Sequence, residues 1–156
     1  MTAYFFDSSA LVKRYVSETG SIWVDGVFTE PSSNTVFIAE VTLVEIGAAF
    51  ARRVRDRAVE GQSMDWIKFR SLLISHLSEY EITPLDREIV NGAMEAAFRH
   101  SLRAYDAVQL WSALLIQERL RLQGLLPLTF VSSDKDLLQA AATPEYQFQI
   151  VDPNTL

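Results

Sequence analysis

Four carboxylate residues lie near the ends of predicted strands or the starts of predicted helices, and together they could form a ligand-binding or catalytic site. Asp7 comes directly after a short apolar run, and Asp134 follows another after two serines. Glu45 and Asp106 lie near the start of two segments with helical hydrophobic spacing. A carboxylate at the carboxyl end of a strand in an open α/β sheet faces the crevice in which such folds bind ligands. Because these ends of parallel strands share one edge, we expect the four acids to converge there.

Four carboxylates gathered at one edge would repel one another and raise one another's pKa values. A divalent cation relieves that repulsion, and it can activate water and stabilise the leaving oxygen of a phosphodiester. The sequence contains no cysteine and only two histidines, so the ligands of such a cation must be mainly oxygen atoms. Oxygen ligands select hard ions such as Mg²⁺ or Mn²⁺.

The acids near the amino terminus and in the middle of the chain also have structural explanations. Ser8 and Ser9 are predicted to cap the helix that follows Asp7, but Asp7 could itself be no more than that cap. Asp106 lies in the first turn of its helix, where the helix dipole favours an acid. That helix is the most apolar of the chain, however, and a buried carboxylate is costly unless it is paired or bound to a metal.

The roles of three further acids, Glu45, Glu40 and Asp136, each have an alternative explanation. Glu45 shares a helical face with Arg52, which could reach a phosphate, although both could simply be solvated charges. Glu40 competes with Glu45 for the place of the second acid, and Glu45 is preferred because small alanines lie on its face of the helix. Asp136 could share a metal with Asp134, but it is interpreted as a helix cap.

Strands and helices alternate along the chain, which indicates a parallel sheet flanked by helices. Strands are expected at residues 4–6, 35–38, 80–83, 128–134 and 148–151. Helices are expected at residues 9–17, 21–28, 41–59, 66–77, 86–100, 102–122 and 136–142, with Gly20 ending the first of them. The predicted fold is a three-layer α/β structure with a mostly parallel sheet of about five strands.

Length and composition limit the classes of protein that remain. A chain of 156 residues that is 49% hydrophobic is expected to form a single domain over residues 1–156 with a substantial core. We find neither a signal peptide nor an apolar stretch long enough to cross a bilayer, so the expected compartment is the cytoplasm. A net charge of −6 argues against a broad electrostatic grip on nucleic acid, but acids gathered around a cation would themselves lower the charge of a nuclease.

Together these features resemble a PIN domain, and in particular the VapC-type ribonuclease toxins of bacterial and archaeal toxin–antitoxin systems. Segments in the family's order and approximate spacing occur over the whole chain, at Tyr4–Lys13, Val44–Ile46, Leu102–Leu110 and Phe130–Asp134. The resemblance implies that Asp7, Glu45, Asp106 and Asp134 bind the metal. It also implies substrate contacts from Ser8 or Ser9 and from Ser132, which takes the place of a threonine common in the family. Arg52 completes the predicted substrate contacts because of its reach toward a phosphate.

The resemblance further implies an endoribonuclease dependent on Mg²⁺ or Mn²⁺, with one of the four acids as general base. It implies a homodimer and a cognate antitoxin, which would inhibit the enzyme by placing a basic residue in the acidic pocket. A catalytically silent PIN-like module that binds RNA or protein is the main alternative. A haloacid-dehalogenase-like phosphatase or a receiver domain is a weaker one, because such a phosphatase carries a second aspartate where this chain has Ser9.

Overall fold

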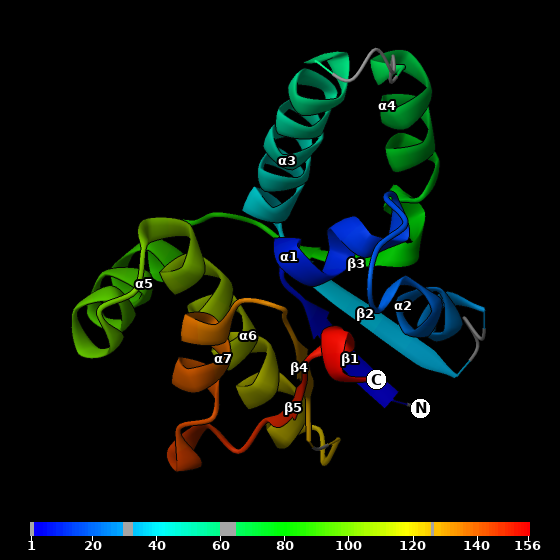
Figure 1. The fold of residues 1–156 in the computed structure, drawn as a ribbon. Helices are drawn as coiled ribbons and strands as arrows, with labels where there is room; N and C mark the ends of the chain where they lie inside the picture. The colour runs from blue at the N-terminus through cyan, green and yellow to red at the C-terminus, as the bar shows by residue number, and fades with distance from the viewer. Residues whose placement is uncertain (1, 30–32, 60–64, 126) are drawn as a thin grey trace.

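The computed structural model describes residues 2–29, 33–59, 65–125 and 127–156. Within these residues a single five-stranded sheet runs through the molecule in the order β3-β2-β1-β4-β5, and every neighbouring pair is parallel (Figure 1). The strands are β1 (Thr2–Phe6), β2 (Asn34–Ala39), β3 (Tyr80–Thr83), β4 (Thr129–Val131) and β5 (Gln149–Val151). The predicted parallel α/β fold is therefore confirmed.

Helices cover both faces of the sheet (Figure 1). The α-helices are α1 (Ser8–Leu11), α2 (Ser21–Phe28), α3 (Glu40–Val59), α4 (Trp66–Ser75), α5 (Arg87–His100), α6 (Ala104–Leu122) and α7 (Lys135–Ala141). Short 3₁₀ helices are η1 (Val12–Arg14), η2 (Leu77–Glu79), η3 (Pro144–Tyr146) and η4 (Pro153–Thr155). Helices α1 to α4 contribute to the core on one face, and α5 to α7 contribute to the core on the other. No described helix has the length and apolar character needed to cross a membrane.

Neighbouring phenylalanines of β1 belong to different cores because successive side chains of a strand point to opposite faces. Phe5 packs on the side of α5 and α6 and stacks on Phe130, with 5.6 Å between ring centroids. Phe6 packs on the other side with Val131 and the helices α1 to α3. All four side chains are fully buried. Burial on both faces explains why these strands read as continuous apolar runs in the sequence.

The strand order places a topological switch between β1 and β4. From β1 the chain adds β2 and β3 on one side, and later β4 and β5 on the other. The segments that follow β1 and β4 therefore diverge and leave a crevice at the carboxyl edge, where ligands bind in open α/β sheets. Asp7 and Ser132 are the first residues after these two strands, and the Asp7 amide donates to the Val131 carbonyl at 3.1 Å.

Two expectations near the amino terminus are wrong. The first helix ends at Leu11 and tightens into η1, because the chain then turns back and the Lys13 ammonium donates to the Thr19 carbonyl at 2.9 Å. Gly20 does not end that helix but precedes α2, with φ of +88°. A Cβ there would lie 2.5 Å from the Pro153 carbonyl oxygen, so both the backbone conformation and the close contact require glycine.

Gly92 allows α5 to approach α6, the helix that carries Asp106. A Cβ at Gly92 would lie 1.7 Å from Cε2 of Trp111, so Gly92→Ala should overpack the contact and reduce the free energy of unfolding by about 2 kcal/mol. Gly26→Ala is the matched control, because a Cβ at this exposed position of α2 meets nothing within 4 Å. Urea unfolding measures the free energy of unfolding of both variants. Equal values for the two variants would show that the Trp111 side chain can move aside without loss of stability.

Candidate active site

A cavity of about 390 Å³ lies at the carboxyl edge of the sheet, and all four predicted acids line it: Asp7, Glu45, Asp106 and Asp134. They come from four different elements, following β1, within α3, at the start of α6 and following β4. The structure therefore brings together residues that are up to 127 positions apart, since 134 − 7 = 127. The cavity is completed by Ser8, Ser9, Arg52, Arg103, Ala104 and Tyr105.

Asp7 is both the cap of α1 and a wall of the cavity. Its Oδ1 accepts from the Ala10 amide at 3.0 Å, so Asp7 is the N-cap, as one of the two interpretations proposed, and the prediction that Ser8 and Ser9 cap this helix is wrong. The Ser9 hydroxyl lies 2.8 Å from both carboxylate oxygens of Asp7. Burial raises the pKa of Asp7 from 3.8 to about 7, although the hydrogen bonds from Ser9 and Ala10 oppose this effect. An ordinary exposed cap would not show such a shift.

The Asp106 carboxyl group responds to the other acids of the cavity. It is half-buried in the first turn of α6. Burial raises its pKa from 3.8 to about 6, with further increases from the negative charges of Asp134 and Glu45, while Arg103 opposes them. The predicted repulsion between acids thus acts on Asp106.

A buried glutamine that sequence analysis missed orients Glu45. Gln109 is 1% exposed, and its Nε2 donates to Oε2 of Glu45 at 2.7 Å and to the Thr42 hydroxyl at 2.9 Å. The signal in the sequence is a polar amide within the most apolar helix, three positions after Asp106 and therefore near the same helical face. Gln109 links α6 to α3 at the cavity.

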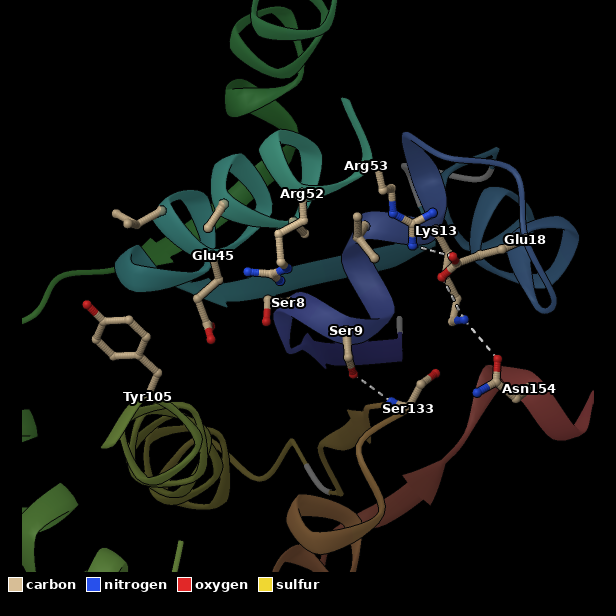
Figure 2. Close-up of a pocket in the computed structure, with 14 residues that line it drawn as sticks. Ser8, Ser9, Lys13, Glu18, Glu45, Arg52, Arg53, Tyr105, Ser133 and Asn154 are labelled. Atoms are coloured by element: carbon tan, nitrogen blue, oxygen red, sulfur yellow. Dashed lines mark hydrogen bonds and ion pairs between the residues drawn. The ribbon is translucent and has the colours of Figure 1, made fainter. Parts of the chain in front are cut away.

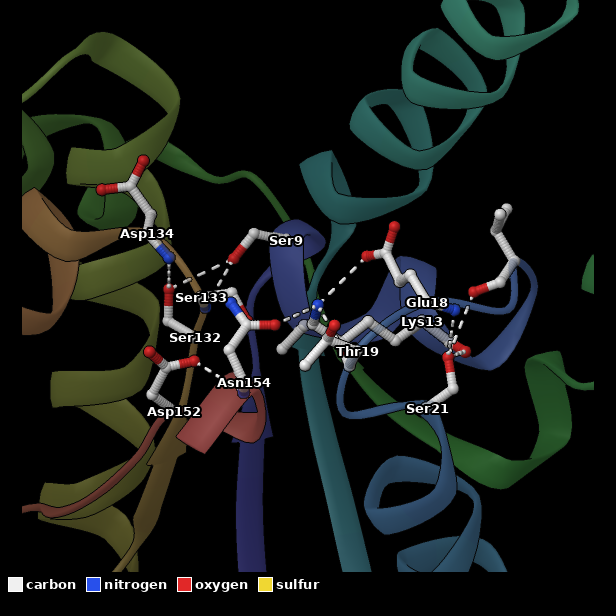
Figure 3. Close-up of polar contacts among 12 residues, drawn as sticks. Ser9, Lys13, Glu18, Thr19, Ser21, Ser132, Ser133, Asp134, Asp152 and Asn154 are labelled. Carbon is white, nitrogen blue, oxygen red and sulfur yellow. Dashed lines mark hydrogen bonds and ion pairs between the residues drawn. The ribbon is translucent and has the colours of Figure 1, made fainter. Parts of the chain in front are cut away.

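Asp134 is held by the backbone and by a buried serine. Its side chain caps α7 by accepting from the Leu137 amide at 3.0 Å, and its own amide donates to the Ser132 hydroxyl at 3.0 Å (Figure 3). Ser132 has no exposed surface, and its hydroxyl lies 3.3 Å from that of Ser9. Ser132, which was predicted to contact substrate, therefore lies behind the cavity, where it positions Asp134 and Ser9.

The two uncertain acids lie away from the cavity lining. Glu40 is exposed at the start of α3 and accepts from the Leu85 amide at 3.0 Å, which leaves Glu45 as the acid of α3 in the cavity. Asp136 is exposed in the first turn of α7, and the expectation that it caps this helix is wrong because Asp134 does so.

Cationic and aromatic side chains surround the acids. Arg52 and Arg103 line the cavity from α3 and from the residue before α6. Neither arginine makes a side-chain hydrogen bond or ion pair to the residues that the structure describes. Tyr105 is 50% exposed at the same wall. Arg103 and Tyr105 were missed as site residues, although they directly precede Asp106 in the sequence.

The donor set suits a hard divalent cation. The acids offer only oxygen. Burial raises the pKa of Asp7, and burial together with the neighbouring acids raises that of Asp106; a bound cation would counteract both effects. Among the described residues, no three acidic or histidine side chains already lie close enough to hold an ion together. Mg²⁺ keeps several waters and binds through one or two carboxylates, so the residues present fit a hydrated ion.

Comparison with known proteins agrees with this architecture. Residues 4–143 match the family described as the PIN domain. The fold is similar to PAE2754 from Pyrobaculum aerophilum, with a TM-score of 0.62 and 20% identity over 99% of this chain and 91% of that one. It is also similar to VapBC2 from Rickettsia felis bound to a promoter DNA fragment, with a TM-score of 0.61 and 13% identity over 97% of this chain and 98% of that one. A chain of a toxin–antitoxin complex from Klebsiella pneumoniae has a similar fold, with a TM-score of 0.61 and 17% identity over 96% of this chain and 97% of that one. No curated protein matches the sequence.

Proposed function

Because the chain belongs to the PIN domain family, we propose that it is a VapC-like endoribonuclease that requires Mg²⁺ or Mn²⁺. The observation that supports this proposal most is the single cavity lined by Asp7, Glu45, Asp106 and Asp134, in which two carboxyl groups have raised pKa values. Such a site is destabilised by its own charge unless a cation or protons occupy it.

Each side chain has a part in the proposed hydrolysis. When bound, the divalent cation would supply the charge that activates water and stabilises the leaving oxygen of the phosphodiester. Carboxylates of the four acids, together with bound water, would hold the cation, and one of the acids would accept a proton from the attacking water. Arg52 binds the phosphate, and Ser8 and Ser9 orient the water or the substrate.

An antitoxin is the proposed protein partner. The similar structures from Rickettsia felis and Klebsiella pneumoniae are a VapBC assembly and a toxin–antitoxin complex by description. An acidic cavity would accept a basic side chain from such a partner, and this contact would block the site. We also propose that the chain forms one domain over residues 1–156, assembles as a homodimer and acts in the cytoplasm.

Cleavage of RNA in a metal titration tests the proposed function. The purified protein should cleave at least one of tRNA, rRNA or messenger RNA when Mg²⁺ or Mn²⁺ is added, and EDTA should abolish the cleavage because the ligand set is oxygen only. Gel electrophoresis of end-labelled RNA measures the products. Undiminished cleavage in EDTA would contradict the mechanism, and no cleavage at any metal concentration would favour the catalytically silent module.

A further inference from the structure

A second cavity of about 520 Å³ adjoins the acidic one (Figure 2). Ser8, Ser9, Glu45, Arg52 and Tyr105 line both, so the two cavities share a wall. A phosphodiester held at the acids would therefore direct a neighbouring nucleotide into the second cavity. The following inference rests on the proposed ribonuclease function.

The walls of the second cavity suit a nucleobase. Residues of α3 form an apolar surface that includes Val44, which is 63% exposed, and Ala48. Tyr105 of α6 lies opposite α3 (Figure 2). Bases in single strands stack on aromatic side chains while arginine holds the backbone, and Arg52 lies beside the apolar surface.

A buried lysine fixes the orientation of the amide at the far end of this cavity. Lys13 is 5% exposed, and its ammonium donates to Glu18 Oε1 at 3.1 Å, to the Thr19 carbonyl at 2.9 Å and to Asn154 Oδ1 at 2.8 Å (Figure 3). An ammonium has no acceptor, so the amide oxygen of Asn154 must face Lys13. The amide nitrogen of Asn154 then points away from Lys13, and it donates to no other described residue.

The segment that carries Asn154 is held in place. The Asn154 backbone amide donates to Oδ1 of Asp152 at 2.9 Å, and the buried Pro153 packs closely against Gly20. Ser133, across from α3 like Asn154 (Figure 2), lines the same cavity, and its buried hydroxyl has no hydrogen-bond partner in the described chain. The cavity therefore offers one oriented donor, the amide nitrogen of Asn154.

We propose that the second cavity binds the nucleotide next to the cleaved phosphodiester and that Asn154 selects its base by donating to a carbonyl oxygen. An asparagine with both amide groups free pairs bidentately with adenine. The oxygen of Asn154 is engaged by Lys13, so that pairing is blocked. Guanine and uracil carry a carbonyl oxygen where adenine and cytosine carry an amino group, so the site favours guanine and uracil.

Single-stranded oligoribonucleotides that differ only in the base beside the cleaved bond test this selection. With Mg²⁺ present, the parent should cleave the guanine and uracil substrates roughly fivefold faster than the adenine and cytosine ones, as one hydrogen bond allows. Asn154→Asp should reverse the preference, because one oxygen still accepts from Lys13 while the other now accepts from an amino group. Comparing substrates within one variant cancels the general effect of the added charge.

Asp25→Asn provides the control, since it changes a charge at an exposed residue of α2 outside the cavity lining and should keep the parental preference. Tyr105→Ala should raise KM at least about fivefold while Tyr105→Phe stays near the parent, because stacking needs the ring and not the hydroxyl.

The outcomes separate the inference from the function on which it rests. If Asn154→Asp slows all four substrates equally, the inference is overturned and the ribonuclease function stands. If the parent cleaves no RNA, the ribonuclease function fails, and the dissociation constants of the same four oligonucleotides decide whether base selection follows Asn154. If the parent binds none of them, the inference is overturned, and a protein segment becomes the candidate ligand of the cavity.

Discussion

Asp106→Asn is expected to lower metal-dependent RNA cleavage by roughly two to three orders of magnitude, the loss that follows from removing several kcal/mol of transition-state stabilisation. Asparagine keeps the volume and an amide oxygen but removes the charge that the cation requires. Burial holds the Asp106 pKa at about 6, and the charges of Asp134 and Glu45 raise it further, so this carboxyl group lies within electrostatic reach of the other acids. Initial rates on one RNA at saturating Mg²⁺ measure the loss.

Asp136→Asn is the matched control for this effect. Asp136 is an exposed acid near the same edge. Its charge adds only a minor increase to the pKa of Asp106 and it does not line the cavity, so its removal should change the rate by less than about threefold. Asp134→Asn should behave like Asp106→Asn while α7 stays folded, because asparagine also caps helices. Equal rates for the Asp106 and Asp136 variants would remove Asp106 from the proposed metal site.

Asp7→Asn is expected to stabilise the metal-free protein at pH 8 while abolishing cleavage. The pKa of Asp7 is raised to about 7 in the folded state from an ordinary value of 3.8. Below pH 3.8 both states hold this proton, and the contribution of Asp7 to stability is greatest. Between pH 3.8 and about 7 only the folded state holds it, so this contribution falls as pH rises. This difference corresponds to roughly 4 kcal/mol at most, and asparagine removes it.

Thermal melts in EDTA from pH 4 to pH 8 measure this effect. At pH 8 the variant should melt about 5 to 10 °C above the parent, and its stability should depend less on pH. Asp86→Asn is the control, because Asp86 caps α5 in the same way but is exposed. Added Mg²⁺ should raise the Tm of the parent by mass action and that of the Asp7 variant much less. Equal metal-induced shifts would contradict a ligand role for Asp7.

The sequence alone was sufficient to predict the sheet, most helices and the four acids of the cavity. The reason is that hydrophobic period and turn residues are local signals, and alternating strands and helices imply a parallel sheet. Once the sheet is parallel, the residues that follow its strands share one edge, so Asp7 and Asp134 had to lie near each other. Local signals failed at Gly20, because its contact with Pro153 joins distant parts of the chain.

Only the tertiary structure decided how each acid is held and what lies beside it. Glu45 is oriented by Gln109, 64 positions away, and Lys13 fixes the amide of Asn154, 141 positions away. Such contacts follow from packing between elements, and no local spacing encodes them. The raised pKa of Asp7 also follows from tertiary packing. The local sequence around a capping aspartate does not show whether the side chain is buried, but burial between β1, α1 and β4 raises the pKa of Asp7 to about 7.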